Sequence, residues 1–254
     1  MKLDVHINEL ESMKKYPQKL FYKGNLELLQ KPKLSIVGTR RPSSYTKQNI
    51  AKISAGLAKR GYCIVSGAAM GVDGIAHQNA GANNTIAVMA NGLDIRYPKV
   101  NNSLIGKIEE EGLALSQFEQ GFKATPWSFV VRNEVVVALG EKLIVGEADL
   151  NSGTMKSVEF ALQMNKEIFV LPHRLEQSKG TNELLKNGLA KAIYDVDDFL
   201  NQFGEDVSLT SDDFLAYCKQ NPNLNDAIEK YGNLVYEYEL DGKIKFDNSF
   251  IIVL

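Results

Sequence analysis

Seven short apolar runs recur between residues 34 and 196, each five to seven residues long and rich in valine, isoleucine and leucine. None of them alternates apolar and polar positions in the way that a half-exposed strand does. Continuous apolar runs of this length are typical of parallel strands that helices cover on both faces. We therefore expect strands at residues 34–38, 63–67, 85–91, 113–118, 142–148, 167–172 and 192–196.

Helical patterns fill most of the intervals between these runs. The segments "TKQNIAKISAGLAKRG" (46–61) and "GTMKSVEFALQMNK" (153–166), for example, repeat their apolar positions with the period of a helix. Repeated strand–helix units require right-handed crossovers, so the chain predicts an α/β fold with a doubly wound, mostly parallel, Rossmann-like sheet. In such a sheet, ligands bind at the carboxyl ends of the strands, where the following helices begin.

The pattern divides the chain into three parts. Residues 1–33 contain two prolines and suit an extended lead-in packed on the sheet domain, which spans residues 34–204. Residues 205–254 predict two helices, then a hairpin that turns at Asp241-Gly242, and a further strand. Two helices and a hairpin favour a small winged-helix-like domain at this end.

Charge is distributed unevenly along the 254 residues, although the net charge is only -2. Residues 1–62 carry 13 Lys and Arg against 4 Asp and Glu, whereas residues 195–254 carry 4 against 13. A polyanion could therefore bind a basic surface of the first segment, but the acidic final segment is a poor candidate for that role. Solvated surfaces of opposite sign would explain the same gradient without any ligand.

The composition argues against several classes of protein. No apolar run reaches the length of a membrane span, and the first twenty residues lack the apolar stretch of a signal peptide. Cys63 and Cys218 form neither a metal-binding pattern nor a disulfide framework. We expect a cytoplasmic protein without membrane association, metal or cofactor.

An anion site is predicted where the first of these strands ends. Gly38 closes the strand, Thr39, Arg40 and Arg41 follow, and a serine at position 43 or 44 opens a helix. The free amides of a helix start, a hydroxyl and planar guanidinium donors together favour phosphate. The alternative is a tight turn with two exposed arginines.

A second set of donors follows the next strand, in "SGAAMGVD". Beside Ser66, Gly67 and Gly71 permit a close approach of the backbone to a ligand, because glycine adopts positive φ without strain. Asp73 and His77 lie four residues apart and share a helical face. They could form an acid–base pair, but no nucleophile or metal set accompanies them, which favours Asp73 as a local cap with His77 as its partner.

An aromatic ring and a cation come together in "PWSFVVRNEVV". Phe129 and Arg132 are three residues apart at a helix start, so they share a face that could stack a base beside a phosphate-binding cation. The alternative places Trp127 and Phe129 in the core, with Arg132 in a structural salt bridge. Two Gly-Thr helix starts at adjacent strand ends, "NSGT" and "SKGTN", repeat the combination of small residues and free amides.

The known catalytic and nucleotide-binding signatures are missing. The sequence contains no dinucleotide fingerprint, P-loop, nucleophile elbow or glycosidase-like carboxylate pair. The residues themselves therefore predict a phosphate-rich ligand at the carboxyl edge of the sheet, with no evident catalytic machinery.

Six motifs together resemble the DNA-processing protein DprA (Smf) family in their order and spacing. They are "IVGTRRPS", "VSGAAMGVDGIAH", "NGLDIRYP", "SFVVRNEVV", "EADLNSGT" and "SKGTNELL". The resemblance runs from about residue 16 to residue 204. It implies an extended Rossmann fold and a non-catalytic, dimeric, single-stranded DNA-binding protein of natural transformation, which protects incoming DNA and helps to load the RecA recombinase onto it.

The resemblance also implies which residues contact DNA. They are Gly38, Thr39, Arg40, Arg41, Ser66, Gly67, Gly71, Phe129, Arg132, Asn133, Lys179, Gly180, Thr181 and Asn182. Four apolar residues could face a second subunit, although packing onto the sheet explains them equally well: Leu184, Leu185, Leu189 and Ile193. Whether duplex DNA binds, and whether the acidic C-terminal domain contacts DNA or a protein, stays open.

Some positions depart from the family pattern. Glu134 stands where the family usually has a second Arg, and His173 stands where it usually has Gly.

The alternative function is a nucleotide-processing enzyme of the lysine-decarboxylase-like phosphoribohydrolase type. In "NSGTMKSVE", however, Glu159 falls five residues after Thr154 instead of three, which moves the carboxylate to another face of the helix.

Overall fold

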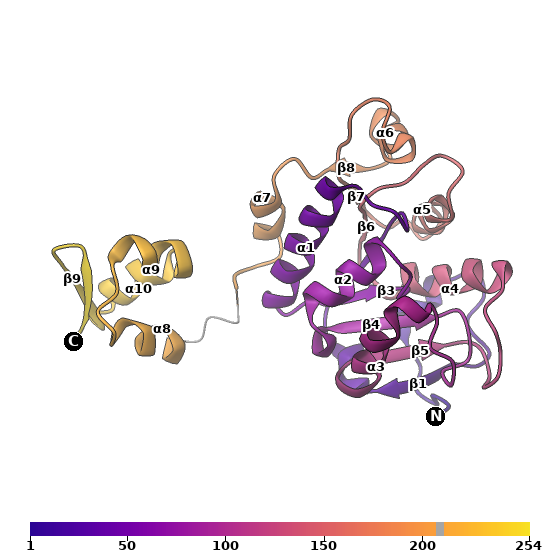
Figure 1. Ribbon diagram of the computed structural model, residues 1–254, viewed down its shortest axis with the longest axis horizontal. Coiled ribbons are helices and arrows are strands. Elements are labelled where there is room, and N and C mark those ends of the chain that lie inside the picture. Colours follow the sequence, from indigo (N-terminus) through magenta and orange to yellow (C-terminus); the bar gives the residue numbers. More distant parts are fainter. Residues whose placement is uncertain (207–210) are drawn as a thin grey trace. The chain divides into compact units, whose positions relative to one another are not determined.

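An eight-stranded sheet organises the first two hundred residues of the computed structural model, which describes residues 1–206 and 211–254 (Figure 1). The strand order is β1-β5-β4-β3-β2-β6-β7-β8, and all neighbours are parallel except β1 and β5. The strands are β1 (Phe21–Gly24), β2 (Lys33–Val37), β3 (Cys63–Ser66), β4 (Thr85–Met89), β5 (Leu113–Ser116), β6 (Leu143–Val145), β7 (Ile168–Val170) and β8 (Lys191–Ala192). This arrangement confirms the predicted α/β fold with a doubly wound sheet.

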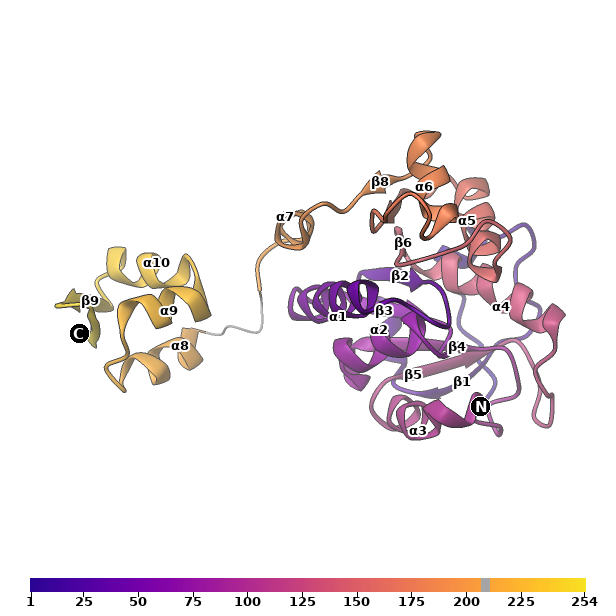
Figure 2. The ribbon, with the colours of Figure 1, turned by 45° about the horizontal axis from the view of Figure 1, so that its top comes forward.

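Helices cover both faces of the sheet, as the continuous apolar runs require (Figure 1, Figure 2). One face carries α1 (Ser44–Lys59), α2 (Val72–Ala80), α3 (Asn102–Glu111) and α7 (Val196–Asn201). The other carries α4 (Pro126–Leu139), α5 (Gly153–Gln163) and α6 (Lys179–Lys186). Within residues 1–206, short 3₁₀ helices precede the first strand and lie in the connections: η1 (Asn8–Ser12), η2 (Leu26–Gln30), η3 (Ala82–Asn84) and η4 (Lys99–Asn101).

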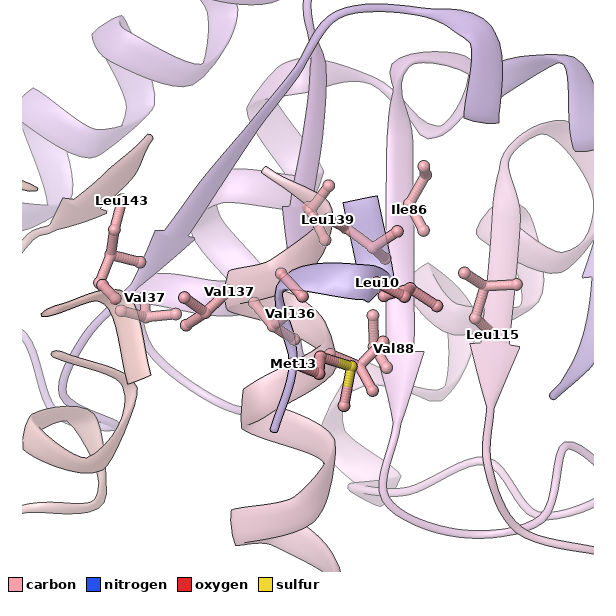
Figure 3. Packing of buried hydrophobic residues seen from close by; sticks show 14 of the residues in the cluster. Leu10, Met13, Val37, Ile86, Val88, Leu115, Val136, Val137, Leu139 and Leu143 are labelled. Atoms are coloured by element: carbon pink, nitrogen blue, oxygen red, sulfur yellow. The ribbon is translucent and has the colours of Figure 1, made fainter. Parts of the chain in front are cut away.

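The N-terminal segment contributes to the largest apolar cluster (Figure 3). Leu10 and Met13 pack with Val136 and Leu139 of α4 over the strands β4 and β5. The same segment supplies β1, which pairs antiparallel with β5 in the register Phe21↔Ser116. Residues 1–33 were expected to be an extended lead-in, and the structure adds an edge strand that covers the side of β5.

The direction of winding reverses between β2 and β6. From β2 the chain builds β3, β4 and β5 on one side, and it returns through α4 to begin the other side at β6. At such a switch point the two loops that leave the carboxyl ends of adjacent strands separate and open a crevice. The loop after β2 therefore lies at the natural ligand-binding position of the sheet.

A second compact unit, Asp206–Leu254, has an apolar cluster of its own. It contains α8 (Ser211–Cys218), α9 (Leu224–Tyr231), α10 (Leu234–Leu240), β9 (Ile244–Asp247) and β10 (Phe250–Val253). The hairpin predicted at Asp241-Gly242 is wrong. Residues 234–240 form a helix because Val235 and Tyr238, three positions apart, are both buried, and Gly242 ends it at φ +67°. The hairpin lies further along, between β9 and β10.

The last predicted strand of the sheet is also corrected. Of residues 192–196, only Ala192 belongs to β8. The Asp195 side chain accepts hydrogen bonds from the amides of Asp197 and Asp198 and so caps α7, which begins at Val196. A helix cap therefore replaces the end of the expected strand.

Candidate nucleic-acid interface

The carboxyl ends of β2, β3 and β4 meet the start of α4 around a small pocket. Its volume is about 20 Å³, enough for roughly one water molecule. The pocket is lined by Arg40, Gly67, Ala69, Met70, Ala90, Asn91, Tyr97, Pro98, Phe129 and Arg132. The structure thus brings together residues from four of the six sequence motifs.

The Phe129 ring lines this pocket and contacts two cations and a second ring. The guanidinium carbon of Arg40 lies 5.3 Å from the ring centroid, and that of Arg132 lies 5.7 Å away. The Tyr97 ring is tilted against it at 6.1 Å. Because Arg40 is exposed and Phe129 is half-buried, an exposed cation and an accessible aromatic face adjoin each other.

Arg132 has a different environment from Arg40, with only 4% of its surface exposed. Its Nη1 donates to the carbonyl oxygens of Gly67 and Val88, the latter at 2.8 Å, and its Nε donates to Asn133 Oδ1 at 3.1 Å. Burial lowers the pKa of Arg132, while nearby Asp73 raises it. The sequence left open whether Arg132 contacts DNA or has a structural role. In the structure, its hydrogen bonds join α4 to the ends of β3 and β4.

The turn between β3 and α2 requires its glycines. A Cβ on Gly67 would lie 2.0 Å from Nη1 of Arg132, and one on Gly71 would lie 2.3 Å from the Thr39 carbonyl oxygen. Gly71 also has φ 80° and ψ -130°, a conformation that is essentially confined to glycine. These glycines let the turn pass close to both the β2 loop and Arg132.

Asp73 and His77 hold this turn from within the fold. Asp73 Oδ2 accepts from the Gly67 amide at 3.2 Å, and His77 Nε2 accepts from the Ala68 amide at 3.3 Å. His77 Nδ1 therefore carries the proton and donates to the hydroxyl of Thr85. Burial raises the pKa of Asp73, and burial together with Arg132 lowers the pKa of His77 to about 3. Asp73 binds the backbone of the turn, as the capping interpretation predicted, but the expected pairing of His77 with Asp73 is wrong, because His77 bonds to Ala68 and Thr85 instead.

Ser66 is likewise structural, since its buried hydroxyl donates to the Ile36 carbonyl oxygen at 2.6 Å.

A shallow basic hollow adjoins the pocket on the side of α1. It is lined by Arg40, Arg41, Pro42, Lys47, Gly71 and Ile75. Three cations with exposed side chains thus border a turn whose backbone is accessible, which is the environment predicted for an anion.

Glu147 fixes the loop that carries these cations. Its Oε2 accepts from the amide and hydroxyl of Ser43 and from the hydroxyl of Thr46, at 3.0, 2.9 and 2.6 Å. Burial acts to raise the pKa of Glu147, but these hydrogen bonds outweigh it and hold the pKa below its usual value. Ser43 is the N-cap of α1, as one of the two predicted serines.

The residues 179–182 lie apart from the pocket. Lys179 borders a separate shallow hollow with residues 149–152, and its Nζ lies 2.9 Å from a carboxylate oxygen of Glu176, which raises the pKa of the lysine. Gly180 and Thr181 are buried, and Asn182 Nδ2 donates to the carbonyl oxygens of Arg174 and Gln177. Only Lys179 of this group offers a charge to solvent.

The four predicted interface residues divide into two pairs. Leu184 and Ile193 are buried in the apolar clusters of the sheet domain. Leu185 is half-buried, and Leu189 exposes 44% of its surface. The alternative of packing onto the sheet therefore accounts for the first pair, while Leu189 presents an apolar surface to solvent.

Two departures from the family pattern have structural partners. Glu134 Oε1 accepts from the backbone amide of Lys14 at 3.1 Å, so it anchors the N-terminal segment on α4. His173 Nε2 lies 3.0 Å from the Gly146 carbonyl oxygen, and the His173 ring packs edge-on against Tyr45. The Glu134 carboxylate and the His173 ring thus join segments of the sheet domain.

The sequence reasoning missed Asn91, Tyr97 and Met70 as pocket residues. The motif "NGLDIRYP" contributed to the family resemblance, but only the tertiary structure shows which of its side chains line the pocket with Phe129. Within the ranges 1–206 and 211–254, no cluster of three His, Cys, Asp or Glu side chains could hold a metal ion. No helix of these ranges is long and apolar enough to cross a membrane.

Comparison with known proteins identifies relatives of the sheet domain. The family model of DNA recombination-mediator protein A matches residues 5–204. The DNA processing protein DprA of Streptococcus pneumoniae is 37% identical over 191 residues, which are 74% of this chain and 67% of that protein. DprA of Bacillus subtilis is 33% identical over 201 residues, 77% of this chain and 67% of that protein.

Solved structures agree with the sequence relatives. The DNA processing protein A of Helicobacter pylori, whose structure describes a single-stranded DNA binding mode, superposes with a TM-score of 0.78. The two chains are 42% identical, and the match covers 80% of this chain and 94% of that one. DprA of S. pneumoniae gives a TM-score of 0.74 at 34% identity, covering 81% and 75% of the two chains.

Proposed function

The chain belongs to the DNA recombination-mediator protein A family, and from this membership we propose that it binds single-stranded DNA along the carboxyl edge of its sheet. The observation that carries the proposal is the position of the Arg40 guanidinium, 5.3 Å from the centroid of the Phe129 ring. A cation beside an aromatic ring matches the repeating unit of a nucleic acid strand, which offers one phosphate and one base per nucleotide.

Phosphates would bind to the basic hollow that follows β2. Arg40, Arg41 and Lys47 supply charge there, and the turn at Gly71 brings backbone close to the same hollow. The residues implied by the family resemblance then act in two ways. Exposed side chains contact DNA directly, and the glycines with buried Ser66 and Arg132 give the surface its shape.

A base would stack on Phe129. The pocket is too small for a whole base, so the base must take the place of Arg40 over the accessible face of the ring. Displacing the guanidinium from the ring frees it for the adjacent phosphate. Binding of a base and of a phosphate would therefore be coupled through Arg40.

Fluorescence anisotropy of a labelled oligo-dT tests this proposal. We expect tight binding by the wild type that weakens steeply as salt rises, because phosphate contacts release counterions. Arg40→Ala should weaken binding by about tenfold at low salt. Lys156→Ala is the matched control, since Lys156 is an exposed cation of α5 outside the pocket and the basic hollow. Binding that does not respond to salt, or full affinity in Arg40→Ala, would contradict the proposal.

We also propose that the site does no bond-making chemistry. Asp73 and His77 are committed to backbone amides, and the exposed carboxylate of Glu159 pairs with Lys156 at 2.9 Å. The phosphoribohydrolase alternative would need that carboxylate at the ligand. Incubation with nucleoside monophosphates should release no free base, and release that is lost in Glu159→Gln would establish the alternative.

In the cell, we propose that a dimer of this protein protects single strands taken up in natural transformation and helps RecA to assemble on them. The family membership supports this role. RecA assembly on a strand covered with single-stranded DNA-binding protein should be faster with the wild type than with Arg40→Ala. Equal rates of RecA assembly would show that the mediator function does not depend on DNA binding through Arg40.

A further inference from the structure

Asn91, one of the residues that line the pocket, carries a buried acceptor atom with no partner. Only 1% of the residue's surface is exposed, and it lines the same pocket as Phe129 and Arg40. Among the residues that the structure describes, none bonds to its Oδ1 atom. A buried amide oxygen without a donor is costly, so a donor that arrives with a ligand would bind there favourably.

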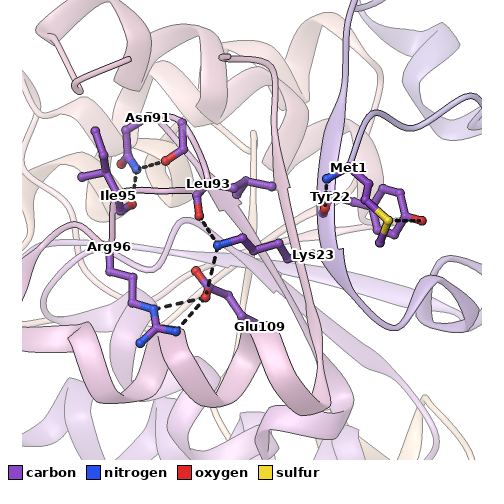
Figure 4. A network of polar contacts seen from close by, with 9 residues as sticks. Met1, Tyr22, Lys23, Asn91, Leu93, Ile95, Arg96 and Glu109 are labelled. Carbon is purple, nitrogen blue, oxygen red and sulfur yellow. Dashed lines mark hydrogen bonds and ion pairs between the residues drawn. The ribbon is translucent and has the colours of Figure 1, made fainter. Parts of the chain in front are cut away.

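The orientation of this amide is fixed by its nitrogen. Nδ2 donates to the carbonyl oxygens of Gly92, at 3.0 Å, and Ile95 (Figure 4). Turning the amide over would place Oδ1 against those two oxygens, which forbids the exchange of O and N. The unpartnered Oδ1 atom is therefore an acceptor, and a ligand would have to supply an N–H or O–H donor to bond with it.

The loop around Asn91 is held rigidly. The Ser116 hydroxyl donates to the Asn91 carbonyl oxygen at 2.7 Å, and Lys23 Nζ donates to the Leu93 carbonyl oxygen. Arg96 forms two hydrogen bonds with Glu109 Oε2, at 3.1 and 2.9 Å (Figure 4). The acceptor is thus preorganised and would cost little further ordering on binding.

The surroundings favour the edge of a base as the donor. Both charged groups of the pocket, Arg40 and Arg132, are cations and supply donors only. The cavity has room for about one water-sized group, such as a single N–H group at the edge of a base, while Phe129 and Tyr97 offer faces for the ring itself. Watson–Crick N–H groups, such as N3–H of thymine, are free on a single strand and engaged in a duplex.

Building on the proposed function, we infer that Asn91 Oδ1 accepts a hydrogen bond from the Watson–Crick N–H of an unpaired base stacked on Phe129. Arg40 then attracts the phosphates of the DNA strand, and Asn91 forms its hydrogen bond only with a base that is unpaired. This contact adds a preference for single strands that charge and stacking do not provide, because phosphates are present in duplex DNA as well.

Two hexamers test the inference: dT6, and a hexamer in which 2,4-difluorotoluene replaces every thymine. This ring has the shape of thymine but carries no N–H, and complete substitution prevents the strand from slipping to a normal base. We expect the wild type to bind dT6 about tenfold more tightly than the isostere hexamer. Asn91→Ala should lose this preference and keep the wild-type affinity for the isostere hexamer, which shows that its pocket is intact.

Arg40→Ala is the matched control, because it should weaken both hexamers by the same factor. Equal affinity of the wild type for the two hexamers would overturn the inference and leave the proposed function standing, with water as the partner of Oδ1. A preference that persists in Asn91→Ala, or equal loss of both hexamers in that variant, would overturn it as well. Failure of the wild type to bind either hexamer would instead refute the proposed function.

Discussion

At the scale of single residues, Arg40 and Arg132 share one aromatic ring but differ in burial. Their guanidinium carbons lie 5.3 and 5.7 Å from the Phe129 centroid, and only Arg40 is exposed. Arg132 donates to two backbone carbonyls and lies near Asp73, so its loss would leave the carbonyls without this donor and the buried Asp73 without a neighbouring cation. Variants of the two arginines therefore report different quantities, DNA affinity for Arg40 and stability for Arg132.

Phe129→Ala should weaken binding of oligo-dT by about tenfold, because one base would lose its stacking surface. Anisotropy titrations at constant salt measure the change. Val130→Ala is the control, since Val130 is an exposed neighbour on α4 that does not line the pocket. A change in the slope of affinity against salt would indicate that Phe129 acts through the phosphates, contrary to this expectation.

His77 should make stability depend on pH. Its pKa falls from 6.5 to about 3 on folding, so between these values the unfolded chain binds a proton that the folded chain does not. The unfolding free energy therefore decreases as the pH falls below 6.5, by about 2 kcal/mol at pH 5.

Urea unfolding of wild type and His77→Gln at pH 7 and pH 5 isolates this effect. Asp73, whose pKa is raised by burial, acts in the opposite direction but is present in both proteins. The difference in stability between the proteins should shrink at pH 5. An unchanged difference would show that His77 takes up its proton in the folded state.

At the scale of elements, the turn between β3 and α2 positions the site through its backbone. The Val72 amide donates to the Thr39 carbonyl oxygen at 3.2 Å, which ties the turn to the β2 loop. The Ala68 backbone is also left-handed, at φ 53°. Substitution in this turn should therefore affect folding and binding together.

Gly71→Ala should lower the unfolding free energy by about 1–3 kcal/mol and weaken binding of oligo-dT, because the new Cβ meets the Thr39 carbonyl at 2.3 Å. Gly153→Ala, at the first position of α5, is the matched control. A Cβ there meets nothing within 4 Å, so the unfolding free energy should stay the same or rise slightly. Similar losses in both variants, measured by urea unfolding, would exclude the steric explanation.

At the scale of the whole molecule, opposite charge is divided between the two units. Residues 206–254 carry 4 Lys against 9 Asp and Glu, and the described members of their apolar cluster lie within residues 214–253. We therefore expect the fragment 1–205 to fold and to bind oligo-dT at least as tightly as the full chain, since it loses net negative charge. A large loss of affinity in anisotropy titrations would show that the C-terminal unit contacts DNA.

The proposed dimer predicts an effect of Leu189, which lies exposed after α6. Leu189→Glu should shift the protein from dimer to monomer in light scattering, because a charge would replace apolar surface at the contact. Val100→Glu, at an exposed position of η4, should leave the dimer intact. Dimers that persist in Leu189→Glu would place the interface elsewhere.

Local patterns determined the parallel strands and the glycine turns of this protein. The strands β2, β3 and β4 are mostly apolar, without regular alternation of polar positions, and all of their residues are buried, so this pattern indicates burial on both faces before any neighbour is known. Local patterns also placed Arg40 and Phe129 at the same sheet edge, because parallel strands align their carboxyl ends.

Features that depend on residues distant in the sequence were determined only by the tertiary structure. The antiparallel pairing of β1 with β5 joins segments about ninety residues apart, and burial of Val235 and Tyr238 made a helix of a segment that alternates like a strand. The inward direction of Arg132 and the unpartnered oxygen of Asn91 follow from backbone carbonyls that meet these side chains only in the fold. Hydrogen bonding of buried groups is a property of the assembled structure, and no local pattern encodes it.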